Sequence, residues 1–231
     1  MTWVVVPAAG RGLRAGAVIP KQYRPICGRP LIEHSLRALA SHPAIEGMVV
    51  VLAAHDEHWP GWTSIQGRPL ITASGGAQRA DSVLAGLDAL PVTVAEHTSV
   101  LVHDAARPCI RRADIAALLE HEDENGALLA VPLADTLKRA DGVGRVIDTV
   151  PREGLWRAVT PQFFRRGLLT RALRAAAAAG VLVTDEAMAM ERIGYSPQLV
   201  EGSADNLKVT TAQDFALAEF LLRQQAAGES V

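Results

Sequence analysis

Cysteine is scarce in this sequence. Among 231 residues there are two, Cys27 and Cys109, which lie in unlike contexts and form no CxxC pair. A disulfide between them is an open alternative, but the pattern favours two free thiols in a reducing compartment. A chain of this length buries a sizeable core without disulfides or metal ions. We therefore expect a fold that requires neither.

Long apolar runs and a strong net charge are also missing. No apolar stretch is long enough to span a bilayer, although 49% of the residues are hydrophobic. The first residues, MTWVVVPAAG, show neither the basic segment nor the cleavage pattern of a signal peptide, and we therefore expect a cytoplasmic protein. A formal net charge of −2 gives no broad attraction to nucleic acid or to an acidic membrane. We expect neither as a partner, so any anion-binding site must come from a local cluster of cations.

What the sequence does have is a regular alternation of apolar runs and amphipathic segments. The runs that predict strands cover residues 3–8, 47–53, 99–102, 126–132, 155–164 and 198–202. The segments that predict helices cover residues 30–42, 77–91, 112–122, 165–180, 184–194 and 210–227. Strands that are apolar throughout favour a Rossmann-like α/β fold, with a mostly parallel twisted sheet and helices on both faces. No repeat, low-complexity linker or domain boundary interrupts the pattern, so we expect one domain over residues 1–231.

Residues 135–150, DTLKRADGVGRVIDTV, break this rhythm. Two short strand-like runs flank Asp141-Gly142, a dipeptide typical of hairpin turns. The segment is polar on both sides. A hairpin that buries neither face against its own domain extends into solvent or packs on a partner. We expect a β-arm at about residues 133–154 through which two chains form a homodimer. A solvent-exposed excursion on a monomer is the alternative.

The loop after the first strand combines flexible backbone with positive charge. It reads PAAGRGLRAGAVIPKQY over residues 7–23. Gly10 and Gly12 let backbone N–H groups approach an anion closely, and Arg14 and Lys21 add charge. In open parallel sheets ligands bind outside the carboxyl ends of the strands. The loop therefore predicts a phosphate-binding site, with a solvated surface loop as the alternative.

Two other glycine-rich motifs compete for this loop. The P-loop spacing G-x-x-x-x-G-K-[ST] has no register here. Gly10, Gly12 and Ala15 match the dinucleotide fingerprint, but that motif needs a helix that begins inside the loop. Three prolines follow in quick order and penalise a helix there, and the first predicted helix begins at Pro30. A long loop that wraps a phosphate group fits better.

These residues carry a family resemblance. PAAGRGLR…PKQY resembles the signature of sugar-phosphate and alditol-phosphate nucleotidyltransferases. Over nearly the whole chain the sequence is similar to the cytidylyltransferase family of the non-mevalonate isoprenoid pathway, which joins 2-C-methyl-D-erythritol 4-phosphate to CMP. The motifs that recur in the same order are GGAQRADSVLAGL, VLVHDAARPC, VPLADTLKR, LWRAVTPQFF, TDEA and QLVEGSADNLKVT.

The resemblance implies a reaction and an assembly. The substrates would be CTP and 2-C-methyl-D-erythritol 4-phosphate, and pyrophosphate would be released. A divalent cation, usually Mg²⁺, would bind mainly through the CTP phosphates. The implied fold is a Rossmann-like α/β domain that dimerises through an extended β-arm, in agreement with the patterns above.

The resemblance also implies roles for individual residues. The catalytic cations would be Arg14, Lys21, Arg152 and Lys208. The nucleotide would be bound by Ala8, Ala9, Gly10, Gly75, Gly76, Ser82, Asp104 and Ala105. The acceptor would be bound by Arg107, Thr136, Arg152 and Lys208. Thr136 would reach the phosphate held by the neighbouring subunit, and Asp104 is the candidate metal ligand.

Some positions leave alternatives open. Arg79 belongs to the nucleotide segment but could equally brace its loop. The family commonly has an acidic pair where this chain has Ala77 and Gln78. A cytosine contact made there by the backbone would survive this change, and one made by a carboxylate would not. Thr184 and Asp185 match a family segment near the acceptor, and helix capping explains them equally well.

The implied chemistry needs charge neutralisation more than a base. The phosphate oxygen of the acceptor is already anionic near neutral pH, so we expect His103 to be structural. The obstacle is repulsion between two phosphorylated reactants, which positioning and fixed cations overcome. The alternatives are an enzyme for another alditol phosphate such as ribitol 5-phosphate, and a catalytically silent nucleotide-binding module. A dinucleotide-dependent oxidoreductase is disfavoured by the prolines.

Overall fold

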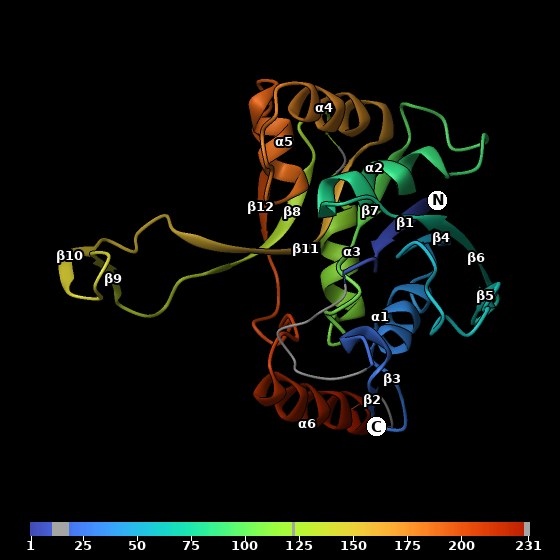
Figure 1. The fold of residues 1–231 in the computed structure, drawn as a ribbon, viewed down its shortest axis with the longest axis horizontal. Coiled ribbons are helices and arrows are strands. Elements are labelled where there is room, and N and C mark those ends of the chain that lie inside the picture. The colour runs from blue at the N-terminus through green and yellow to red at the C-terminus, as the bar shows by residue number, and fades with distance from the viewer. Residues whose placement is uncertain (11–18, 122, 229–231) are drawn as a thin grey trace.

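An eight-stranded sheet forms the centre of the molecule. The computed structural model describes residues 1–10, 19–121 and 123–228 (Figure 1). The strand order is β12-β8-β11-β7-β1-β4-β6-β5. The strands are β1 (Thr2–Pro7), β4 (Ile45–Leu52), β5 (Ser64–Ile65), β6 (Arg68–Ser74), β7 (Ser99–Val102), β8 (Ala127–Pro132), β11 (Trp156–Arg165) and β12 (Gln198–Glu201). Strand β11 runs antiparallel to β7 and β8, and β5 runs antiparallel to β6, whereas the other pairs are parallel. The expected mostly parallel sheet is confirmed.

Helices cover both faces of this sheet, as the apolar strands predict. The helices are α1 (Leu31–Ala40) and α3 (Arg112–Leu119) on one face, and α2 (Arg79–Asp88), α4 (Arg166–Ala178) and α5 (Glu186–Arg192) on the other. Val4 of β1 lies in the same core cluster as Leu36 of α1, and Val5 lies with Leu87 of α2. Successive side chains of a strand point to opposite faces. A strand without polar alternation is therefore buried on both.

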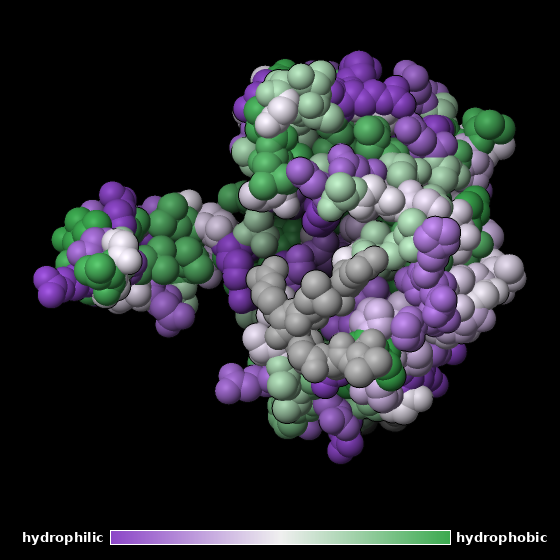
Figure 2. All heavy atoms as spheres, in the orientation of Figure 1, coloured by the Kyte–Doolittle hydropathy of each residue, from purple (hydrophilic) through white to green (hydrophobic). Residues whose placement is uncertain are grey.

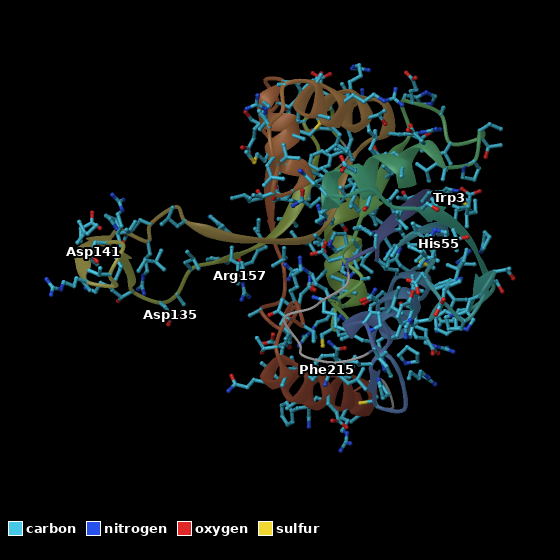
Figure 3. All side chains as sticks on the ribbon, in the orientation of Figure 1. Trp3, His55, Asp135, Asp141, Arg157 and Phe215 are labelled. Carbon is cyan, nitrogen blue, oxygen red and sulfur yellow. The ribbon has the colours of Figure 1, made fainter. Side chains whose placement is uncertain are left out.

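A third layer lies beside the main body. Helix α6 (Ala212–Gly228) packs against the hairpin of β2 (Pro25–Ile26) and β3 (Arg29–Pro30). The guanidinium of Arg24 lies 4.2 Å from the centre of the Phe215 ring, and Figure 3 shows this ring on α6. Cys27 is exposed and Cys109 is buried, and both are free thiols, as predicted.

The expected hairpin is present and projects from the body. Strands β9 (Leu137–Ala140) and β10 (Val146–Val150) pair antiparallel far from the central sheet (Figure 1). The Asp141 carboxylate accepts hydrogen bonds from the N–H groups of Val143 and Arg145, which closes the turn. Val143 is 79% exposed, and Val146 and Ile147 are each 62% exposed. Figure 2 shows apolar side chains gathered on this arm.

In the part of the chain that the structure describes, no helix is at once long enough and apolar enough to cross a bilayer.

Candidate active site

Two cavities lie side by side at the carboxyl ends of the strands, where ligands bind in open α/β sheets. The first cavity has a volume of about 360 Å³ and is lined by residues 7–10, 21–22, 76–79, 82, 104–106 and 208. The second cavity has a volume of about 240 Å³ and is lined by residues 79, 104, 107, 158–160, 162, 184–185 and 208. Arg79, Asp104 and Lys208 line both. These three residues form the common wall between two binding spaces.

The first cavity contains most of the residues predicted to bind a nucleotide. Ala8, Ala9, Gly10, Gly76, Ser82, Asp104 and Ala105 all belong to its lining. Gly75 lies outside the lining, where a Cβ atom would come 2.6 Å from the Cβ of Ala9 and 2.7 Å from the Oγ of Ser82. Gly75 therefore lets the end of β6 approach the end of β1.

The N-terminus of α2 opens on the first cavity. A Cβ atom on Gly76 would lie 2.3 Å from the Cβ of Asp81, so only glycine fits against the first helical turn. Gln78 and Asp81 form a capping box, in which the Gln78 N–H donates to Asp81 Oδ2 at 3.0 Å. The departure from the family's acidic pair thus leaves a well-capped helix. A helix N-terminus favours a bound anion because its free N–H groups carry partial positive charge.

A short 3₁₀ turn, Lys21–Tyr23, carries the predicted cation Lys21 into the first cavity. The Lys21 Nζ donates to the carbonyl of Val209 at 2.9 Å. Gln22 Nε2 donates to the carbonyl of Ala8 at 2.9 Å, and the Tyr23 hydroxyl donates to Asp56 at 2.7 Å. Each residue of the turn is therefore tied to a different part of the fold.

The predicted cation Arg14 lies outside the described residues, as do Gly12 and Ala15.

The common wall is a network of ion pairs centred on Asp104. Its carboxylate lies 2.9 Å from Arg79 Nε, 2.8 Å from Lys208 Nζ and 3.6 Å from Arg107 Nε. Burial alone would raise the pKa of Asp104. The three cations outweigh burial and hold this pKa well below its usual range. The carboxylate therefore stays ionised and keeps Arg107 and Lys208, two cations predicted to bind the acceptor, beside it.

Arg79 braces the wall rather than standing free. Besides Asp104, it contacts both carboxylate oxygens of Glu186, at 2.6 Å and 3.1 Å. Glu186 is 1% exposed. Burial lowers the pKa of Arg79, but the charges of Glu186 and Asp104 raise it above its ordinary value. The bracing alternative is the one that the contacts favour, although Arg79 also lines both cavities.

We expect Asp104→Asn to lower the free energy of unfolding at pH 7 by about 3 kcal/mol, because Arg79, Arg107 and Lys208 lose the buried carboxylate that they share. The native pKa of Asp104 lies below its unfolded value of about 3.9. The stabilisation is therefore complete above about pH 5, begins to decline as the pH falls below the unfolded pKa, and is lost fully only near the native pKa. Denaturant unfolding at pH 7, 5 and 3.5 measures this difference. A difference that stays constant over this range would show that the ion pairs are not its source.

His103 is a buried structural residue. One ring nitrogen lies 3.1 Å from the carbonyl of Arg107, and the other lies 3.1 Å from the Thr160 hydroxyl. Burial lowers the pKa of His103 to about 4, so its ring is neutral near pH 7. These contacts support the structural role that the sequence indicated.

The second cavity receives only some of the predicted acceptor residues from its own chain. Arg107 and Lys208 line it, but Thr136 and Arg152 do not belong to the described lining. Both are exposed on the arm, where Arg152 donates to the carbonyl of Ala134. Figure 3 shows Asp135, the neighbour of Thr136, out on the arm. Within one chain, the fold does not bring these two predicted residues to the cavity.

The structure confirms helix capping for Asp185, and it places both Thr184 and Asp185 beside a cavity. Both line the second cavity. Asp185 also caps α5, because its carboxylate accepts the Met188 N–H at 3.0 Å. Its other oxygen accepts from Gln162 Nε2 at 3.0 Å. Sequence reasoning missed Gln162, which lines the cavity, and Glu186, although both lie within motifs that it quoted.

The described residues do not form a metal site of their own. Within the described ranges, no group of three or more His, Cys, Asp or Glu side chains could hold a metal ion. Asp104 is the only carboxylate in the described lining of the first cavity. Because it already faces three cations, a divalent cation would need most of its oxygen ligands from elsewhere.

Comparisons with known proteins agree with this geometry. The family model for 2-C-methyl-D-erythritol 4-phosphate cytidylyltransferase (IspD) matches residues 2–224. A protein of that name from Stenotrophomonas maltophilia (strain K279a) is 58% identical over 226 residues, which cover 97% of each chain. One from Xanthomonas euvesicatoria pv. vesicatoria (strain 85-10) is 57% identical over 228 residues, covering 98% of this chain and 86% of the relative.

Solved structures show the same likeness. A crystal structure of 4-diphosphocytidyl-2C-methyl-D-erythritol synthase superposes with a TM-score of 0.83 at 39% identity, covering 96% of this chain and 98% of that one. The cytidylyltransferase from Thermus thermophilus gives a TM-score of 0.78 at 34% identity, with the same coverage. The expected fold and family are both confirmed. The chain belongs to the 2-C-methyl-D-erythritol 4-phosphate cytidylyltransferase family.

Proposed function

We propose that this protein transfers CMP from CTP to 2-C-methyl-D-erythritol 4-phosphate in isoprenoid precursor biosynthesis. The products are 4-diphosphocytidyl-2-C-methyl-D-erythritol and pyrophosphate. The observation that carries the proposal is the common wall of two adjacent cavities, in which Arg79 and Lys208 flank Asp104. Two phosphorylated substrates can meet at such a wall because its cations reduce the repulsion between them.

CTP occupies the first cavity in this proposal. The backbone of Ala8, Ala9 and Gly10 and the N-terminus of α2 face the nucleotide. Lys21, together with Arg14 from the loop, neutralises the triphosphate. A divalent cation such as Mg²⁺ would be held mainly by the triphosphate, since Asp104 is the single carboxylate of the described lining. When bound, such an ion would neutralise negative charge on the triphosphate.

The acceptor occupies the second cavity, with its phosphate between Arg107 and Lys208. A second copy of the chain completes the site, because Thr136 and Arg152 lie on an arm that reaches away from their own cavity. The exposed apolar residues Val143, Val146 and Ile147 give this arm a surface to bury on a partner. The homodimer therefore forms through the arm, and we place it in the cytoplasm.

The reaction is an in-line displacement at the α-phosphorus. An oxygen of the acceptor phosphate forms a bond to this phosphorus, and the bond to the bridging oxygen of pyrophosphate breaks. The nucleophile is already an anion, so no residue has to remove a proton. Lys21 and Arg14 stabilise the charge that builds up on the α-phosphate and the leaving group. Arg107 and Lys208 hold the nucleophile in line.

Pyrophosphate release with CTP and a panel of polyol phosphates tests the function. We expect release with 2-C-methyl-D-erythritol 4-phosphate and little with ribitol 5-phosphate or without an acceptor. A preference for ribitol 5-phosphate would identify an enzyme for another alditol phosphate. CTP binding without release for any acceptor would indicate a nucleotide-binding module instead.

A further inference from the structure

The backbone segment 206–209 joins the two cavities. Arg107 Nη1 donates to the carbonyl of Asn206 at 2.7 Å, and Lys21 Nζ donates to the carbonyl of Val209 at 2.9 Å. Between these carbonyls lies Lys208, whose Nζ is 2.8 Å from Asp104. Segment 206–209 thus contacts Arg107 and Lys21 through its carbonyl groups and carries Lys208 itself.

This segment has little regular structure to hold it. Residues 206–210 belong to neither a helix nor a strand. The Val209 N–H donates to the carbonyl of Ala106 at 2.8 Å, and the Asn206 N–H donates to Ser203 at 3.1 Å. The side chain of Asn206 supplies a further anchor, because its Nδ2 donates to the carbonyl of Thr160 at 2.7 Å.

Thr160 makes this anchor a common reference point. It lies on β11, and its hydroxyl accepts the Asp104 N–H at 3.0 Å. One strand residue therefore fixes the backbone of Asp104 through its hydroxyl and segment 206–209 through its carbonyl. The ion pair between Asp104 and Lys208 then links the two backbone segments that contact Thr160, the one at Asp104 and segment 206–209.

The position requires a side chain that donates a hydrogen bond, since only the nitrogen of the Asn206 amide has a partner in the described structure. A carbonyl oxygen only accepts hydrogen bonds, so the nitrogen of Asn206 must face Thr160. An aspartate would place acceptor against acceptor, and a leucine would leave the carbonyl unpaired in a buried place. Asn206 is 1% exposed and belongs to neither cavity lining in the described structure. A substitution here therefore acts through the segment rather than through substrate contact.

We propose that Asn206 is a positioning residue that sets Lys21, Arg107 and Lys208 in register across both cavities. The inference rests on the proposed function, since it assigns Lys21 to the nucleotide and Arg107 and Lys208 to the acceptor. Loss of the Asn206 anchor displaces cations on both sides at once. No single cation variant does this.

Steady-state kinetics of Asn206→Asp and Asn206→Leu test the proposal. Both variants keep the approximate size of the side chain, and only the first adds a charge. We expect kcat to fall on the order of 10²-fold, as small misplacements of catalytic groups can cause. We also expect the KM for the acceptor to rise in the same variants. Arg107→Ala, by comparison, should mainly raise the acceptor KM.

Asn125 provides the matched control, because it is the only other asparagine in the chain. Its Oδ1 accepts the Ser196 N–H at 3.2 Å, and it is absent from the described linings of both cavities. Asn125→Asp should leave kcat and both KM values unchanged. Thermal unfolding of all variants separates loss of stability from loss of register.

The outcomes are distinct. Lower unfolding temperatures with unchanged kinetic constants below the transition would show that Asn206 is only structural and would overturn the proposal. If neither size-matched variant folds, Asn206→Ala, which also lacks a side-chain donor, is measured in the same way, with the same decisive result. An inactive wild-type protein would refute the proposed function, whereas an active wild type with normal Asn206 variants would refute this inference alone.

Discussion

Lys21→Ala is expected to lower kcat on the order of 10²-fold or more, with a much smaller change in the KM for CTP. The ground-state triphosphate is also held by the backbone of residues 8–10 and by the N-terminus of α2 in the proposed binding mode. The charge of Lys21 matters most when the α-phosphate becomes crowded by the incoming phosphate. Removing the cation should therefore affect the transition state more than it affects nucleotide binding.

The local structure makes Lys21 a clean target. Gln22 and Tyr23 tie the same turn to Ala8 and Asp56 without the lysine side chain. The backbone should therefore keep its place in the variant. Pyrophosphate release over a range of CTP concentrations gives kcat and KM, and thermal unfolding checks the fold.

Arg174→Ala is the matched control for the loss of a cation. Arg174 lies on α4 and pairs with Asp88, and both side chains are more than half exposed. Its removal should leave both kinetic constants unchanged. If Lys21→Ala kept a normal kcat and raised only the KM for CTP, Lys21 would be a ground-state binding residue.

The sequence predicted the body of the fold because burial left a clear pattern there. Strands such as β1 and β4 are buried on both faces, so they read as continuous apolar runs. Strand β6 escaped notice because its sequence, RPLITAS, contains Pro69 and buries only Leu70, so it does not read as an apolar run. A proline fits there because it lies near the start of the strand, next to the short edge strand β5.

The candidate site was predictable only in part. Family motifs supplied the cations, and the end of each strand supplied their approximate place. Nothing in the sequence shows that Arg79 faces Glu186, which is 107 positions away. An acidic residue in the first turn of a helix has an ordinary explanation as a helix-stabilising charge. The role of Asn206 was likewise not predictable, because its hydrogen-bond partner is a backbone carbonyl, which any residue type can provide.

The position of the arm raises the question of whether Thr136 and Arg152 contribute to the site of their own chain or to that of a partner chain. Thr136 and Arg152 are exposed on a hairpin that leaves its own sheet, while Arg107 and Lys208 remain at the second cavity. If the arm completes the partner's site, every site contains residues of two chains. Arg152→Ala and Lys208→Ala then damage the same site from opposite chains.

We therefore expect two poorly active variants to restore each other. A heterodimer of an Arg152→Ala chain with a Lys208→Ala chain has one site that lacks both residues and one that lacks neither. It should show about half the activity of the wild type, because a two-fold dimer has two equivalent sites. Co-expression with two different affinity tags isolates this heterodimer, and pyrophosphate release measures its activity.

The reciprocal heterodimer is the decisive control. It pairs a wild-type chain with a chain that carries both substitutions. If the arm serves the partner, each of its sites lacks one residue and activity should stay low, although one chain is intact. If Arg152 serves its own chain, the pattern reverses, so that this heterodimer is half active and the first is not. Failure to isolate any heterodimer from well-expressed chains would instead contradict the dimer itself. Whether the arm contributes to the partner's site or to its own therefore decides which of the two heterodimers is the more active.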